Sequence, residues 1–278
     1  KYTRKFWILK ASGGAEISQN YSPQPVISAG LIYKILPKKF LLSVSVSNQF
    51  RRPTFNEKYW LPGGNPNIMP EKALNTEGGF NWSVLRNNKY RLTLNNRVFY
   101  TKIHDMIRWI PVEGIWTAVN NREINNRGFE TDMNFVISQS QFKLKTNLAH
   151  YYTRSSIASE GELFPGKKAY QLMYVPKHRF KFFALIGKKY WQTGLSLRHT
   201  GRRHTTDTPT LNNELPSYLK ADLIVKAHYS MNAVKLSLQV RAENITDTYY
   251  ESIKAFPAPG RMIFISLTIS YKQYENIH

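Results

Sequence analysis

The sequence of 278 residues has no cysteine and few acidic residues. Without cysteine, the chain holds no disulfide, no thiolate metal site and no thiol nucleophile. Only 18 Asp and Glu stand against 39 Lys and Arg, so the formal net charge is +21. Such a charge predicts an anionic partner, and composition alone leaves nucleic acid, phosphate-bearing lipid and an acidic protein surface open.

Long apolar runs are also missing. No stretch approaches the roughly 20 apolar residues that a membrane-spanning helix needs. Hydrophobic residues nevertheless make up 42% of the chain, and aromatic residues 14%. A hydropathy test for helices does not detect β-barrels, because their strands alternate between lipid and lumen and average to polar.

Alternation with a period of two recurs along almost the whole sequence. In the segment 40–50, Leu42, Val44 and Val46 share one face, while Ser43 and Ser45 share the other. The segments 129–137, 142–148, 219–229, 233–243 and 261–271 follow the same pattern. About twelve such segments of about nine residues or more suit tilted strands that cross a membrane.

Three further patterns favour a membrane barrel over a β-sandwich, which would also alternate. The polar face carries long cations, as a wet lumen allows, and aromatic residues gather near strand ends, as in interfacial girdles. The cations are Lys143, Lys145, Lys220, Lys226 and Arg241. The third and strongest pattern is that short and long connections alternate, as periplasmic turns and external loops do in outer-membrane barrels.

The short connections are 36–39, 86–89, 138–141, 187–189 and 230–232, and the long polar ones are 51–72, 103–122, 154–176, 201–216 and 248–259. The sequence therefore predicts an all-β fold, an antiparallel transmembrane β-barrel of about twelve strands in this chain. Its long loops are expected outside the cell. The last strand, 261–271, is expected to descend into the periplasm.

Several motifs resemble TonB-dependent outer-membrane receptors, in particular receptors for vitamin B12 and siderophores. The box FRRP (50–53) is followed by GNPN (64–67) and PE (70–71). Further along the chain come DMIRW (105–109), NRGFE (126–130), YVPKH (174–178), ENITDTYY (243–250) and PGR (259–261). These motifs cover nearly the whole chain in the order that the family has. Arg52 and Met69 are mild departures from the family pattern.

The resemblance implies a plugged barrel of 22 strands, of which this chain would form the C-terminal part. It also implies import of a scarce nutrient such as cobalamin or a ferric siderophore, with energy delivered through TonB to a plug domain. We expect residues 1–271 to form barrel and 272–278 to form a short periplasmic tail. The plug and the remaining strands are expected outside this chain, in a longer polypeptide or in a companion chain, because about twelve strands account for only part of the 22. The start at Lys1 with no signal-peptide pattern agrees with a processed or cut chain.

Candidate ligand contacts are aromatic residues in the predicted outer loops: Tyr59, Trp60, Trp116 and Phe256. The competing interpretation of each is that it packs a loop or touches lipid headgroups. Haem receptors of this family carry a histidine between the two boxes, and the segment 56–64 has none. No cofactor and no metal site is expected.

Three other functions are compatible with parts of the sequence pattern. A self-contained pore of about twelve strands is a legitimate architecture. An enzyme is not expected, because the histidines lack a strained nucleophile motif such as Gly-x-Ser-x-Gly. Nucleic-acid binding is not expected either, because the cations lie on alternate strand positions, in short turns and at an outer rim, where phosphates of the outer-leaflet lipopolysaccharide account for them.

Overall fold

A single antiparallel sheet dominates the computed structural model, which describes residues 2–3, 6–18, 21–157, 170–206, 213–231 and 233–271. The thirteen strands of the sheet lie side by side in chain order. They are β1 (Tyr2–Thr3), β2 (Trp7–Ser18), β3 (Tyr21–Leu36), β4 (Phe40–Arg51), β5 (Glu71–Arg86), β6 (Tyr90–Val112), β7 (Ile115–Gln139), β8 (Phe142–Ile157), β9 (His178–Gly187), β10 (Trp191–Thr200), β13 (Tyr218–Met231), β14 (Val234–Glu243) and β17 (Met262–Tyr271). Apart from the two-residue β1, the sheet contains the twelve strands that the alternation predicted.

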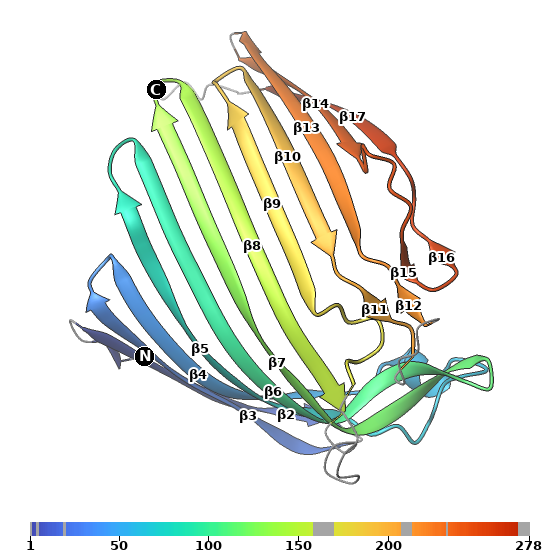
Figure 1. The fold of residues 1–278 in the computed structure, drawn as a ribbon. Helices are drawn as coiled ribbons and strands as arrows, with labels where there is room; N and C mark the ends of the chain where they lie inside the picture. Colours follow the sequence, from blue (N-terminus) through green and yellow to red (C-terminus); the bar gives the residue numbers. More distant parts are fainter. Residues whose placement is uncertain are drawn as a thin grey trace, which may run out of the picture.

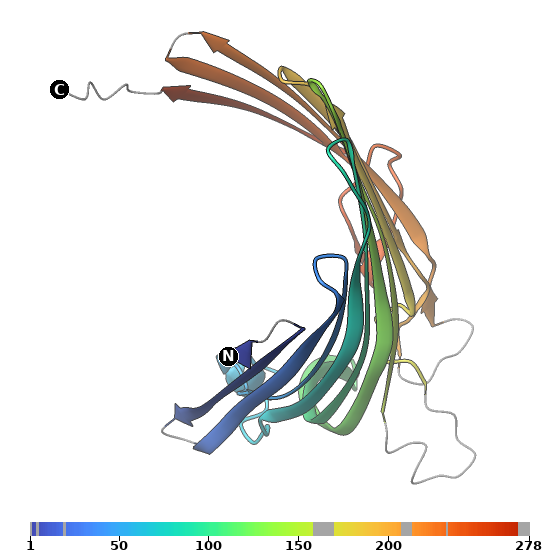
Figure 2. The same cartoon turned by 90° about the vertical axis from the view of Figure 1, so that its left-hand side faces the viewer.

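The sheet curves into an arc, with β2 to β4 near one end and β14 and β17 at the other (Figures 1 and 2). Among the described residues, β17 pairs only with β14, and it does not reach β1 or β2. The arc is therefore open, and the described strands do not form the self-contained barrel of about twelve strands that the sequence also allows. The antiparallel meander itself was predicted correctly.

The two faces of the sheet differ in chemistry, as the period of two requires. Leu42, Val44 and Val98 lie on one face with 39%, 56% and 52% of their surface exposed. Register continues this apolar face across β14 and β17, where Val240 lies opposite Ile265. Because an outer-membrane barrel turns apolar residues to lipid and polar ones to the lumen, we assign the apolar face to the lipid.

The opposite face is polar and belongs to the lumen of the barrel. Register places the predicted cations on it: Lys143 lies opposite Gly187, which lies opposite Gln192, which lies opposite Lys226. Arg97 on this face bridges two carboxylates, with 3.0 Å to Glu77 and 2.7 Å to Glu130. The polar face thus carries cations in register, and Arg97 on it is paired with carboxylates of neighbouring strands.

Connections alternate in length as predicted, with one correction. The segment 103–122 was expected to be a polar loop, but β6 and β7 continue through it as a long hairpin, and only Glu113 and Gly114 form the turn. Both turn residues have positive φ, 50° and 83°, as a two-residue hairpin loop demands. The sequence pattern missed this hairpin because its strands extend beyond the membrane, where no lipid enforces apolar alternation.

The other long connections carry small elements of their own. Helix α1 (Phe55–Tyr59) lies between β4 and β5; the pair β11 (Arg203–His204) and β12 (Glu214–Leu215) lies between β10 and β13; and β15 (Glu251–Ile253) pairs with β16 (Phe256–Pro257) before β17. No helix in the described part of the chain combines the length and hydropathy of a membrane span. The stretch 272–278, predicted as a periplasmic tail, lies outside the described residues.

Candidate functional site

Three cations lie in a row on the lumen face, close to the long loops. Lys181 on β9 lies opposite Arg198 on β10, and Arg198 lies opposite Lys220 on β13. β10 ends at Thr200 and β13 begins at Tyr218, so this row stands at the external end of the wall. Like charges directly opposite one another destabilise a sheet unless another group compensates them.

Two carboxylates compensate part of this charge. Asp222 contacts both Arg198 and Lys220, and Glu243 lies 3.2 Å from Lys220. Lys181 makes no ion pair with a carboxylate among the described residues. The row therefore keeps an excess of positive charge.

Tyrosines stand around the cations. The guanidinium of Arg179 lies 5.2 Å from the centre of the Tyr151 ring, and the ammonium of Lys181 lies 5.1 Å from it. On the other side, the Tyr218 and Tyr250 rings stack at 4.3 Å. We name the set Tyr151, Arg179, Lys181, Arg198, Tyr218, Lys220 and Tyr250 the basic–tyrosine wall.

A hollow of about 240 Å³ lies on this wall, lined among others by Arg179, Lys181, Arg198, Tyr218 and Tyr250. Guanidinium and ammonium groups donate hydrogen bonds to anions, and tyrosine rings offer flat surfaces and hydroxyls to a conjugated ligand. The arrangement can therefore hold an anionic, partly aromatic molecule. It offers no nucleophile paired with a base.

Behind the wall, Arg203 ties two external segments together. Its side chain is buried, and its guanidinium donates to the carbonyl oxygens of Glu251 and Pro216, both at 3.1 Å. It also lies 5.0 Å from the centre of the Tyr218 ring. Burial lowers the pKa of Arg203 from its usual value, and the contact with Tyr218 opposes that change. Arg203 therefore links the loops around the wall to one another.

Three of the four predicted contact residues lie in one loop assembly. Tyr59 ends α1 and is 55% exposed, while Trp60 follows it and packs edge-on against Trp109 of β6 at 5.5 Å. Trp116 lies in the β6–β7 hairpin, where Gly63 passes against its carbonyl group. A Cβ atom at Gly63 would lie 1.8 Å from that oxygen, so only glycine permits this approach. The structure thus brings Tyr59, Trp60 and Trp116 into one region.

The fourth predicted residue lies in a different loop. Phe256 belongs to the β15–β16 hairpin between β14 and β17, and 64% of its surface is exposed. No ring contact is present between Phe256 and the other described aromatic residues. A role of these four residues in ligand contact stays a prediction.

The motif residues around the first long loop serve as scaffold. The Arg51 guanidinium reaches both carboxylate oxygens of Glu71, at 2.8 and 2.9 Å, and both of Glu57, at 3.1 Å. Glu57 closes the capping box of α1 with Thr54, and Glu71 accepts from the Ile107 N–H at 2.7 Å. One arginine therefore joins β4, α1, β5 and the β6–β7 hairpin.

A small apolar core supports the same assembly. Ile68 from the β4–β5 loop packs with Ile107 and Ala118 of the hairpin, with Trp109 beside them. The Asn120 side chain accepts from the Met69 N–H at 2.8 Å and donates to the Met69 carbonyl oxygen at 2.9 Å. The loop is consequently held against the hairpin along its length.

The sequence pattern did not predict the basic–tyrosine wall. It identified Lys220 as a lumen cation but did not propose Arg179, Lys181, Arg198 or Tyr218 as ligand contacts. One signal was present: cations at every second position in strands that adjoin a long loop. What was missing was the register that brings residues from four strands together.

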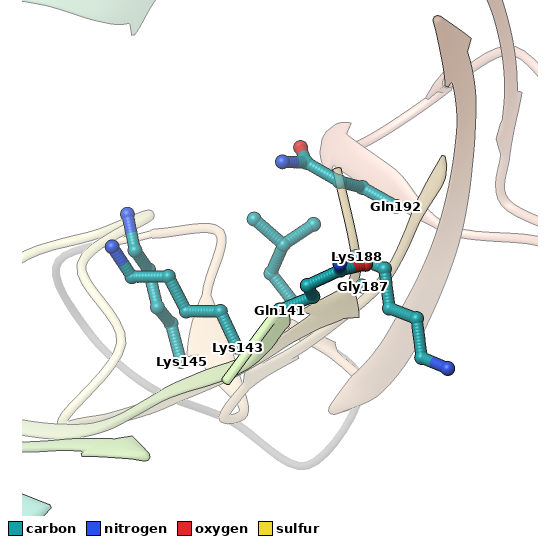
Figure 3. A pocket seen from close by; sticks show the side chains of 7 residues that line it. Gln141, Lys143, Lys145, Gly187, Lys188 and Gln192 are labelled. Atoms are coloured by element: carbon teal, nitrogen blue, oxygen red, sulfur yellow. The ribbon is translucent and has the colours of Figure 1, made fainter. Parts of the chain in front are cut away.

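A second hollow on the lumen face lies at the end with the short turns. It measures about 260 Å³ and is lined by Gln141, Lys143, Lys145, Leu185, Gly187, Lys188 and Gln192. Lys143 and Lys145 extend from β8 in the same direction, whereas Lys188 points away from them (Figure 3). In the described part of the chain, no group of three His, Asp or Glu side chains is placed to hold a metal ion.

Comparison with known proteins places this architecture in a family. A family model described as TonB dependent receptor-like, beta-barrel, matches residues 13–245. The chain is 23% identical over 271 residues to the vitamin B12 transporter BtuB of Vibrio cholerae, covering 94% of this chain and 39% of the relative. It is 32% identical over 242 residues to BtuB of Vibrio vulnificus, covering 82% and 34%. The chain thus spans well under half the length of the curated relatives that it matches.

Solved structures share the fold. The ferric enterobactin receptor PfeA of Pseudomonas aeruginosa superposes with a TM-score of 0.68 at 15% identity, covering 97% of this chain and 44% of the receptor. The siderophore receptor PiuA of Acinetobacter baumannii gives a TM-score of 0.66 at 18% identity, covering 96% and 41%. The motifs, the meander and these matches agree: the chain belongs to the TonB-dependent receptor-like β-barrel family, and its sheet is part of a bacterial outer-membrane barrel.

Proposed function

We propose that this chain forms the C-terminal part of the barrel of an outer-membrane receptor that imports an anionic nutrient complex, with ferric siderophores as the favoured class. The observation that supports this is the basic–tyrosine wall at the external end of the lumen face. Arg179 and Lys181, which make no ion pair among the described residues, lie against the Tyr151 ring and line the hollow on this wall. Cobalamin, the nutrient that names the curated relatives, is the other candidate.

We also propose that transport by this receptor is driven through TonB. In this family, TonB acts on a plug domain inside the barrel, and we propose that a plug outside residues 1–271 completes this receptor. The stretch 272–278 then forms a periplasmic tail. The open edges of the sheet support this arrangement, because further strands are needed to enclose a lumen.

Transport assays on the full-length receptor test the proposal. It is expressed in a host without its own siderophore and cobalamin receptors, and uptake of radiolabelled ferric siderophores and cobalamin is measured. We expect saturable ferric siderophore uptake that disappears in a host without TonB. Arg179→Ala with Lys181→Ala should raise the KM about tenfold, as the loss of two charge-assisted contacts implies.

A matched control is available on the same face. Lys226→Ala with Lys235→Ala removes the same charge from the lumen face near the short turn between β13 and β14. This is the end of the strands away from the basic–tyrosine wall, so the KM should stay unchanged. Saturable uptake of cobalamin without uptake of ferric siderophores would make cobalamin the ligand in place of ferric siderophores. Uptake without saturation and without TonB would overturn the receptor and favour a pore.

A further inference from the structure

Two arginines face each other on the lipid side of the sheet. Arg127 on β7 lies opposite Arg154 on β8, and Tyr100 on β6 lies opposite Arg127. The same register puts Phe129 opposite Tyr152 and Met133 opposite Leu148 along this face. The arginines therefore share a face with the apolar belt, away from the basic–tyrosine wall.

This pair is unusual because no carboxylate in the described part of the chain compensates it. Arg97 and Arg198 on the lumen face each contact a carboxylate, and Lys102 on the lipid face lies 2.9 Å from Glu123. Among the described residues, neither Arg127 nor Arg154 makes an ion pair. Two uncompensated like charges directly opposite in a ladder repel each other, so an anion from outside the chain would stabilise them.

The position along the strands defines the surroundings of the pair. It lies two residues, about 7 Å, beyond Phe129 and Tyr152 in the direction of the long loops. The Tyr100 hydroxyl beside it donates to Asn125 at 2.7 Å, so the face becomes polar there. Aromatic residues mark the border of the hydrocarbon layer in barrels. The pair thus stands at the level of the outer-leaflet headgroups.

We propose that Arg127 and Arg154 form a binding site for the phosphate group of an outer-leaflet glycolipid. A guanidinium binds phosphate through two parallel N–H donors, and two guanidinium groups on neighbouring strands can hold one phosphate between them. Phe129 and Tyr152 lie where the acyl chains of the same molecule begin. Charge and depth together select a lipid over a soluble anion, which would have no contact with this apolar belt.

Glycolipid retention by the purified receptor tests the site. The full-length receptor is extracted from outer membranes in mild detergent, and bound glycolipid per receptor is quantified by mass spectrometry after washing at rising detergent. Arg127→Ala with Arg154→Ala should weaken retention about thirtyfold, since each cation near a lipid surface contributes about fivefold. Arg127→Lys with Arg154→Lys should weaken it less, because charge remains but the paired donors are lost.

The control removes two cations at the other membrane border. Lys188→Ala with Lys189→Ala changes exposed side chains in the turn between β9 and β10 and should retain glycolipid like the unchanged receptor. Every variant is first shown to fold by its heat-modifiable gel shift. A second arm uses a host whose glycolipid lacks phosphate, and retention by the unchanged receptor should fall to the level of the double alanine variant. Equal glycolipid retention by the unchanged receptor and the double alanine variant would overturn the site. Glycolipid retention that does not depend on lipid phosphate would overturn it as well.

Discussion

Glu57 shows how one side chain decides the state of a loop. Its carboxylate accepts from the Thr54 N–H at 2.7 Å and from Arg51 at 3.1 Å, although only 10% of the side chain is exposed. Burial alone would raise the pKa of Glu57, but these donors outweigh it and lower the pKa below 4.5. A carboxylate with a lowered folded pKa stabilises the folded loop at neutral pH.

This pKa shift predicts an acid-sensitive loop. The stabilisation is present above the unfolded pKa of 4.5 and is lost as the pH falls through the lower folded value. The protection factor of the segment 55–71 against hydrogen exchange in the full-length receptor, corrected for the intrinsic rate at each pH, should therefore fall as the pH drops through the lowered pKa of Glu57. Glu57→Gln should lower this protection factor at pH 7 already, at a cost of about 1–3 kcal/mol, and should remove most of its pH dependence. A pH response that persists in Glu57→Gln would assign the effect to another group.

Gly63 predicts a steric effect at the same loop. Gly63→Ala places a methyl group against the Trp116 carbonyl and should break the 2.8 Å hydrogen bond from the Ala118 N–H to the Gly63 carbonyl oxygen. Proteolysis of the loop on intact cells should then increase. Gly78→Ala is the matched control, because its nearest neighbour would be a Val98 methyl at 3.8 Å. Equal protease resistance of the two variants would show that the loop is not held at Gly63.

At the scale of the strand, alternation assigns neighbouring residues to different solvents. Leu238 and Gln239 are adjacent on β14, yet Leu238 lies with Ala227 and Leu267 on the lipid face, and Gln239 lies with Ser266 on the lumen face. Leu238 has 44% of its surface exposed, which lipid would cover. The same substitution at these two positions therefore tests the assignment of the faces.

Leu238→Arg should destabilise the folded barrel by about 2–4 kcal/mol, because it puts a charge near the middle of the lipid layer. Gln239→Arg should change stability by less than about 1 kcal/mol, because the lumen is wet. Urea unfolding of the full-length receptor in lipid vesicles, followed by the heat-modifiable gel shift, measures both. Greater damage from Gln239→Arg would reverse the assigned faces.

At the scale of the whole sheet, the described strands form an open arc, and β17 pairs only with β14 among them. Ile263, Ile265, Leu267 and Ile269 on β17 are 62–72% exposed, whereas Leu238, which lies opposite Leu267 on β14, is 44% exposed. Unpaired edges of long strands are rare in barrels because closure removes them. The edge of β17 therefore fits another strand of the receptor.

Hydrogen exchange of β17 in the full-length receptor tests this pairing. If a strand outside this chain pairs with the free edge, all backbone amides of β17 should exchange as slowly as those of β13. If the edge stays open, the amides that point away from β14 should exchange much faster. The second pattern would show that the barrel is not closed at this strand.

The lumen charge makes a second prediction at this scale. A separately supplied plug should bind a receptor from which the plug has been deleted, and its affinity should fall as salt screens Lys143, Lys145 and the other lumen cations. Lys143→Ala with Lys145→Ala should reduce this dependence on salt. Binding that is indifferent to ionic strength would show that the positive wall plays no part in holding the plug.

The sequence by itself determined the class of fold, the number of long strands, the two faces and the family. These properties follow from local patterns: a strand in contact with lipid on one side and water on the other must alternate, and turns differ in length between the two sides of the membrane. The prediction of a polar loop at 103–122 was wrong because apolar alternation is no longer imposed on strands that extend beyond the membrane.

Only the tertiary structure decided which residues meet. Lys181, Arg198 and Lys220 lie far apart in the sequence, and antiparallel register alone makes them neighbours on the wall. The same holds for Arg127 and Arg154, whose opposition depends on a register that a shift of one residue would abolish. Pairing across strands is set by the whole sheet, and no single segment of the sequence contains that information.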